Sequence, residues 1–184
     1  MNGKISDVLM EVASDLCHYL EALLPRLSEQ WWTELVVRVL SFQQQRAVEQ
    51  RKITALSGLD IAALLRVLDQ NWYAIAAIKN PPAEARHYVK EMRSVRDRWA
   101  HASIDAFSQD DIYRDLDTIQ RFAMIIDAED TFIEKIRGLK AEVLLPPSPP
   151  RVTSPAPTVP LTPSLNLRQS VGESPRPPLL QNRA

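Results

Sequence analysis

One segment of the chain, HYVKEMRSVRDRWAHAS (residues 87–103), gathers the side chains whose types and spacing could carry chemistry. Arg93, Asp97 and His101 are four residues apart, so a helix would stack them along one face with Arg96 at its edge. Histidine can transfer protons near neutral pH, and arginine can stabilise charge that develops on phosphorus. Asp97, one turn before His101, can orient the imidazole ring by accepting its hydrogen bond. The pattern therefore points to cleavage of a phosphodiester bond.

RNA is the substrate that suits this set of side chains, because its own 2′-hydroxyl can act as the nucleophile without a metal ion. One cysteine and three scattered histidines are too few for a structural zinc site, so we expect no metal and no cofactor. The surrounding helix is locally basic, and we expect Lys90, Arg93 and Arg98 to contact RNA phosphates. The alternative is an ordinary solvated helix face, because charged side chains at helical spacing are common.

The motif Arg96-Asp97-Arg98-Trp99-Ala100-His101 resembles the R-[N/D/H]-x-x-x-H signature of the HEPN superfamily of small helical bundles. The flanking sequences are similar to the HEPN subtype named after a yeast transcript-quality-control endonuclease. These sequences are LSGLDIAALLRVLDQNWYAI (56–75), VKEMRSVRDRWAH (89–101) and DDIYRDLDTIQRF (110–122). The resemblance covers most of residues 1–130, and in bacteria similar modules accompany helicase-like ATPases and phage-defence proteins.

By this resemblance, Arg96 and His101 form the family's catalytic pair and Asp97 occupies the polar position between them. That position is more often Asn in the family, and Asp places a negative charge close to the scissile phosphate. The resemblance also implies a metal-independent endoribonuclease that works as a homodimer, with two motifs facing each other across a cleft. An antitoxin or a helicase-like ATPase is the further partner that such a system would supply.

A second hypothesis is a non-catalytic module that recruits or senses a partner, because many HEPN domains serve in that way. The chain would then be an interaction domain, or a detached part of a larger ATPase. Residues 1–145 carry 18 basic and 22 acidic residues, a net charge of −4, which does not favour strong electrostatic binding of RNA.

Apolar residues recur at helical spacing through the first 145 residues, which predicts an all-α bundle of five to six antiparallel helices. In this bundle Trp99 shares a buried stripe with Val89, Met92 and Val95. The first expected helix ends at Pro25. The second starts near Ser28 and runs into QQQRAVEQRK, and the remaining helices cover about 57–79, 82–102, 108–126 and 129–142.

The last 39 residues differ in composition from the rest of the chain. Residues 146–184 hold 11 of the 14 prolines and four arginines against one acid. We expect a disordered tail or linker there, because so little apolar surface cannot offset the entropy of ordering the chain. No apolar run is long enough for a membrane span, and a cytoplasmic protein is the default expectation.

Other residues with reactive side chains are expected to have structural or surface roles. Cys17 and His18 lie on or beside the apolar stripe of the first helix, so packing is expected. His87 is expected at the surface, two turns before the motif. The acids that begin the helix at 108–126 suit the positive end of its dipole and do not require a metal.

Overall fold

The computed structural model describes residues 2–100 and 107–145, and the expected tail at 146–184 lies outside these ranges. No strand occurs among the described residues, and the all-α class is confirmed. None of the described helices is both long and apolar enough to cross a lipid bilayer. The α-helices are α1 (Asn2–Leu27), α2 (Phe42–Arg51), α3 (Ile61–Gln70), α4 (Trp72–Lys79), α5 (Ala85–Ala100), α6 (Gln109–Ile125) and α7 (Asp130–Leu144). Short irregular turns form η1 (Trp32–Val36), η2 (Val37–Val39) and η3 (Leu56–Gly58).

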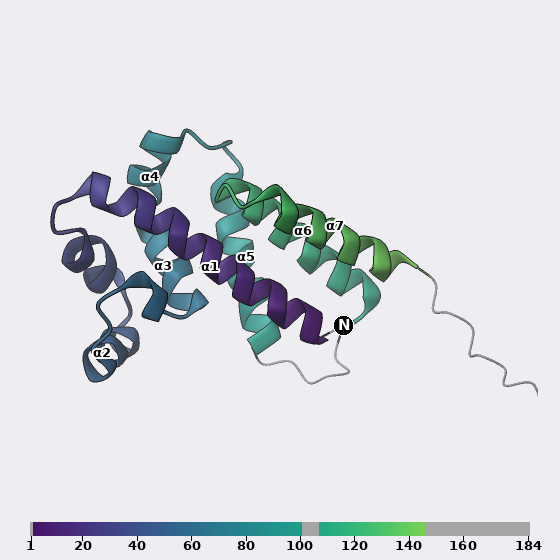
Figure 1. Cartoon of the computed structure of the whole chain (residues 1–184), viewed down its shortest axis with the longest axis horizontal. Helices are drawn as coiled ribbons and strands as arrows, with labels where there is room; N and C mark the ends of the chain where they lie inside the picture. The colour runs from purple at the N-terminus through teal and green to yellow at the C-terminus, as the bar shows by residue number, and fades with distance from the viewer. Residues whose placement is uncertain (1, 101–106, 146–184) are drawn as a thin grey trace, which may run out of the picture. The chain divides into compact units, whose positions relative to one another are not determined.

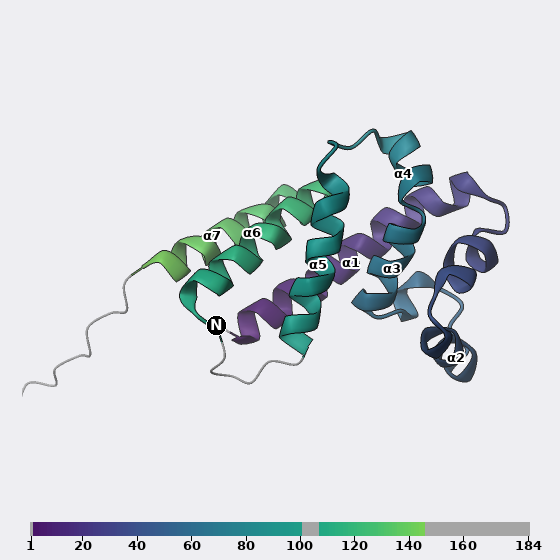
Figure 2. The ribbon, with the colours of Figure 1, turned by 180° about the vertical axis from the view of Figure 1, so that it is seen from behind.

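Helices α3, α5, α6 and α7 pack side by side in that order, and α1 lies across α3 and α6 (Figure 1). Viewed from behind, α5 crosses in front of α1, so α1 leaves this face of α5 uncovered (Figure 2). Each of the main helices contributes fully buried apolar side chains to one core. Examples are Leu16 and Leu20 of α1, Leu68 of α3, Met92 of α5, Phe122 of α6 and Ile136 of α7.

Helix α5 carries residues 96–100 of the motif, and its apolar stripe is as predicted except at one end. Val89, Met92 and Val95 are fully buried, whereas Trp99 is only partly buried and packs at the edge of the core. The indole N–H needs a hydrogen-bond acceptor, which keeps this ring at the boundary between apolar and polar surroundings. The helix begins at Ala85, three residues later than predicted. It follows a turn in which the Ala85 N–H donates to the Pro82 carbonyl at 3.0 Å.

The segment from 28 to 40 departs from the continuous helix that the sequence predicts. It forms the π-helical turn η1 and the 3-10 turn η2, and the backbone is extended at Leu40 and Ser41. Ser41 accepts a hydrogen bond from the Gln44 N–H (3.3 Å), and the Gln44 side chain accepts one from the Ser41 N–H (3.0 Å). This capping box starts α2 as a separate helix. Val36 and Leu40 are buried, whereas the regular helix that the sequence predicts here is wrong.

Two other helices also have boundaries that the apolar pattern does not predict. Helix α1 continues through Pro25 to Leu27, and the third predicted helix is divided at Asn71 into α3 and α4. The Asn71 amide donates to the carbonyls of Val67 and Leu35, both at 2.8 Å. The Val67 carbonyl also accepts from the Asn71 backbone N–H at 3.2 Å, so the side-chain amide adds a second bond there and connects the break to Leu35.

The N-caps show how local side chains set helix starts. Ser108 accepts a hydrogen bond from the Asp111 N–H at 3.1 Å, which confirms the predicted cap of α6. The start predicted at Ser57 is wrong, because Ser57 lies in η3 and Asp60 caps α3 instead. The Asp60 carboxylate accepts from the Ala63 N–H at 2.8 Å.

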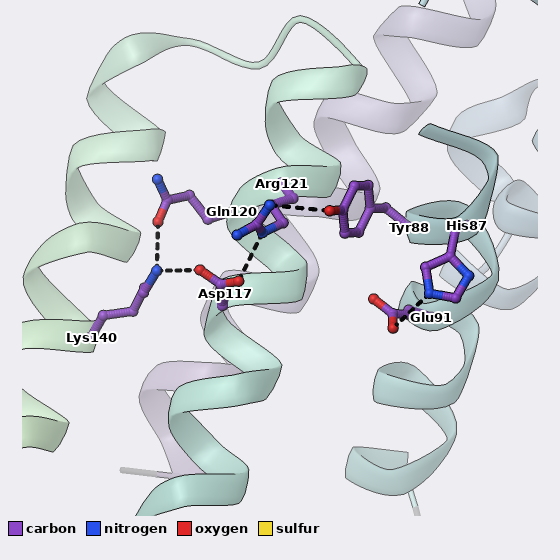
Figure 3. Close-up of polar contacts among 7 residues, drawn as sticks. All are labelled: His87, Tyr88, Glu91, Asp117, Gln120, Arg121 and Lys140. Carbon is purple, nitrogen blue, oxygen red and sulfur yellow. Dashed lines mark hydrogen bonds and ion pairs between the residues drawn. The ribbon is translucent and has the colours of Figure 1, made fainter. Parts of the chain in front are cut away.

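A polar network on the surface connects α5, α6 and α7 (Figure 3). Arg121 of α6 donates to the Tyr88 hydroxyl (3.0 Å) on α5 and to the Asp117 carboxylate (2.8 Å). Lys140 of α7 donates to Asp117 (2.5 Å) and to Gln120 (3.1 Å). The partial burial of Asp117 opposes its ionisation. The hydrogen bonds from Lys140 and Arg121 outweigh this effect and hold the pKa of Asp117 below its usual value.

We expect Asp117→Asn to reduce stability at neutral pH and to have less effect in acid. A lowered pKa in the folded state stabilises the protein above the pKa of the unfolded chain, and this contribution disappears as the pH falls through the folded value. Because the pair is partly exposed, the loss at pH 7 should be about 1 kcal/mol or less. Urea unfolding at pH 7 and about pH 3 measures it, with the exposed Asp7→Asn as the control. A difference from wild type that is the same at both pH values would contradict this expectation.

Candidate active site

Three motif-region side chains of α5 meet residues of α3 and of the start of α2 around one surface hollow of about 230 Å³. We call this the arginine hollow, because three of its lining residues are Arg66, Arg93 and Arg96. Its remaining lining residues are Ser41, Gln44, Ala62, Leu65 and Asp97. The structure thus brings together the predicted residues Arg93, Arg96 and Asp97.

Carboxylates hold two of these guanidinium groups. Nη1 of Arg96 donates to Oδ1 of Asp97 at 3.0 Å, and Nη2 of Arg96 lies 3.9 Å from Oδ2 of Asp60. The Arg96 side chain is 26% exposed, so it is partly buried yet open to a ligand at the surface. Nη1 of Arg93 lies 3.6 Å from Oδ2 of Asp69, whose side chain is 10% exposed. These contacts fix the directions of the two arginines that α5 contributes.

The charge and the size of the arginine hollow indicate what it can bind. Its lining carries three arginines and one aspartate, and two further carboxylates, Asp60 and Asp69, lie 3.9 Å from Arg96 and 3.6 Å from Arg93. Arg66 is the arginine of the hollow that has no carboxylate partner among the described residues. A concave surface that presents a cation without a counter-charge attracts ions of the opposite sign. Its volume is below the roughly 300–1,000 Å³ of sites that enclose drug-sized molecules. The hollow therefore suits a compact anionic group such as a phosphate.

The opposite side of α5 is fixed by a buried carboxylate. Asp115 of α6 is 1% exposed, and it accepts a hydrogen bond from the Trp99 indole N–H at 2.8 Å. The same carboxylate forms an ion pair with Arg98. The Trp99 ring packs against Phe107 with 4.4 Å between ring centroids. Arg98 and Trp99 thus face α6, while Arg93, Arg96 and Asp97 face α3.

The other predicted site residues are placed differently. Lys90 is exposed and does not line the arginine hollow, and Arg98 points to Asp115. His101 lies outside the described residues, so its expected contact with Asp97 does as well. Arg66 was not singled out as a site residue from the sequence. Its position could have drawn attention, because it is a single arginine within the apolar run IAALLRVL on α3.

The structure also describes Cys17, His18 and His87, for which structural or surface roles were expected. Cys17 is buried, and burial raises the pKa of its thiol to about 11, with Glu21 adding to the effect, so the thiol is unreactive. His18 is exposed, so its predicted packing role is wrong, because the helix turns this position away from the core. His87 lies at the surface as predicted, 3.1 Å from Glu91 on the next turn (Figure 3). Among the described residues, no group of three or more His, Cys, Asp or Glu side chains is arranged to bind a metal ion.

A larger hollow of about 400 Å³ lies between the α4–α5 connection and the end of α6. Its cations already have partners: Lys79 pairs with Asp127, and Arg121 binds Asp117 and Tyr88. The arginine hollow is the stronger candidate for anion chemistry because one of its cations, Arg66, has no carboxylate partner among the described residues.

A model of the Swt1-like HEPN family matches residues 8–127, which include most of α1 and all of α2 to α6. The chain belongs to this family, which is associated with ribonuclease activity. The match ends at Asp127, so α7 lies beyond it. Neither a curated protein nor a solved structure matches the chain.

The pairing of Arg98 with buried Asp115 predicts an effect on stability. Arg98→Ala leaves a buried carboxylate without its cation and should lower the free energy of unfolding by about 3 kcal/mol. Asp115→Ala leaves Arg98 free to reach water and should cost less, about 1–2 kcal/mol.

Urea unfolding of both single variants and of the double variant checks this prediction. The double variant should be more stable than the sum of the single effects implies, because the second change removes the uncompensated charge. An Arg98→Ala protein as stable as wild type would show that the ion pair contributes nothing.

Proposed function

We propose that the chain is a metal-independent endoribonuclease that uses Arg96 and His101. The observation that carries this proposal is the position of Arg96, at a hollow lined by three arginines, on the helix whose sequence resembles the family motif. Membership of a family associated with ribonuclease activity supports it. By the resemblance of the motif, His101 is the proton-transfer group, and the biological setting is phage defence or stress response.

In the proposed reaction, the 2′-hydroxyl of one nucleotide attacks the adjacent phosphorus and loses its proton to a base. The bond from phosphorus to the 5′-oxygen breaks, and an acid protonates that oxygen as it leaves. The products are a 2′,3′-cyclic phosphate and a 5′-hydroxyl. Arg96 stabilises the charge on the phosphoryl oxygens, and its bond to Asp97 at 3.0 Å fixes its direction. His101 transfers a proton, and RNA supplies the nucleophile, so the reaction requires no metal.

We propose that the active form is a homodimer. One motif supplies one imidazole, whereas the reaction gains from both a base and an acid. Two copies related by a two-fold axis would supply both groups, because such an interface presents the same surface twice. The face of α5 that α1 leaves uncovered is available for such an approach (Figure 2).

The non-catalytic interaction module remains a second candidate, favoured by the net charge of −4 over residues 1–145. In that function, Arg96 would bind an acidic partner, such as an antitoxin or a helicase-like ATPase, in place of RNA.

We expect His101→Ala and Arg96→Ala each to slow RNA cleavage by about 10²–10⁴-fold, the usual cost of losing a positioned catalytic group. Gel assays with labelled RNA in the presence of EDTA measure the rate, and end-group analysis identifies the cyclic phosphate. Arg137→Ala, an exposed residue of α7, removes the same charge elsewhere and should cleave normally.

Cleavage that disappears in EDTA would contradict the metal-independent route. If wild type cleaves no RNA while Arg96→Ala loses a protein partner, the interaction module is the correct function.

We also expect the cleavage rate per protomer to rise with total protein concentration over the range in which dimers form. Sedimentation and activity, measured over the same dilution series, should give the same midpoint. Full activity of the monomer would rule out a composite site.

A further inference from the structure

Arg66 differs from the other two arginines of the hollow in how it is held. Its Nε donates to the main-chain carbonyl of Val39 at 2.6 Å, and the side chain is half-buried. Arg93 and Arg96 each have carboxylates within 4.0 Å, whereas within residues 2–100 and 107–145 Arg66 has none. Arg66 therefore carries a positive charge that no carboxylate among the described residues neutralises, and this charge is available to an anion.

The contact to Val39 leaves the outer end of Arg66 available. Val39 ends the irregular η2 turn, so its carbonyl has no partner of the kind that a regular helix supplies. The Nε–H of Arg66 donates to this carbonyl instead. Among the described residues, the two terminal nitrogens of Arg66 form no hydrogen bond, and the residue lines the arginine hollow. A guanidinium anchored at Nε presents its terminal N–H groups in a fixed direction, which is the geometry that suits phosphate oxygens.

Arg93 shares this hollow from the neighbouring helix. Asp69, itself nine-tenths buried, lies 3.6 Å from Nη1 of Arg93 and holds that side chain from below. Arg66 therefore comes from α3 and Arg93 from α5, with Arg96 one turn further along α5 toward His101.

We propose that Arg66 and Arg93 bind an RNA phosphate next to the scissile one, and so place the substrate for Arg96. This subsite rests on the proposed ribonuclease function for its meaning, but its ability to bind RNA can be measured separately. Arg66 and Arg93 are positioning residues in this scheme, since the reacting phosphate lies at Arg96 and His101. A substrate with a single phosphodiester gains nothing from the subsite, whereas a longer RNA does.

The binding test uses single-stranded RNA with 2′-O-methyl groups, which the enzyme cannot cleave, over a range of salt concentrations. Arg66→Ala and Arg93→Ala should each weaken binding by about tenfold or more, since hydrogen bonds to charged groups are lost. Each should also lower the slope of log affinity against log salt by about 0.7, the value for one phosphate contact on a single strand. Arg137→Ala should leave both quantities at the wild-type values.

Loss of the Val39 contact can destabilise Arg66→Ala, so the urea unfolding of each variant is measured first. Arg93→Ala lacks such a backbone contact among the described residues, and it keeps the test decisive if Arg66→Ala does not fold. An unchanged salt slope in the folded variants would overturn the proposal. Competition by inorganic phosphate without any change in the RNA slope would identify a site for free phosphate and would overturn it as well.

The cleavage test compares a dinucleotide with an oligonucleotide. Arg66→Ala should raise KM for the oligonucleotide while kcat/KM for the dinucleotide stays at the wild-type value. An equal loss on both substrates would show that Arg66 acts at the reacting phosphate and would overturn the subsite. If wild type cleaves neither substrate, the ribonuclease function fails, and the salt slope still decides whether the subsite binds RNA.

Discussion

The rotation of α5 about its own axis is the constraint on which the candidate site depends, and buried Asp115 sets it. A carboxylate with 1% exposure must be compensated. Among residues 2–100 and 107–145, the side chains that do so both belong to α5, Arg98 by an ion pair and Trp99 by a hydrogen bond. Successive helical residues point about 100° apart. Arg98 lies about 200° from Arg96 around the helix, so once Arg98 faces α6, Arg96 faces the opposite side, toward α3. A polar contact on one side of the helix thus determines where the catalytic candidate points.

The other wall of the site depends on a segment without regular secondary structure. The turns η1 and η2 leave carbonyl groups that a continuous helix would have paired. Asn71 donates to Leu35, and Arg66 donates to Val39, so side chains of α3 and its C-cap replace the missing backbone bonds. The irregular segment and the arginine hollow share Arg66. A substitution in this segment can therefore change the site without touching any residue of the motif.

The sequence predicted those parts of the structure that depend on periodicity and local capping. Apolar spacing gave the buried stripe Val89–Val95, and the residue pattern at Ser108 gave the start of α6. It did not predict the breaks at Ser41 and Asn71, because each depends on side chains that reach carbonyls brought near by tertiary packing.

In the candidate site, too, the sequence predicts what depends on local spacing and not what depends on tertiary packing. Arg93, Arg96 and Asp97 share a surface because they are close in sequence on one helix, so spacing alone could predict their meeting. Arg66 joins them from another helix, about 30 residues earlier in the chain, and its role depends on how α3 packs against α5. The orientation of Arg98 toward α6 depends in the same way on Asp115, 17 residues later.

The position of Trp99 also has a spectroscopic consequence. Its indole ring packs against Phe107 and binds a buried carboxylate, directly before residues 101–106 in the chain. Of the other three tryptophans, Trp72 is buried, and Trp31 and Trp32 contact each other near η1. Trp99 is therefore an intrinsic fluorophore within the motif. Emission from a protein that keeps only this tryptophan would report directly on rearrangement at that end of α5.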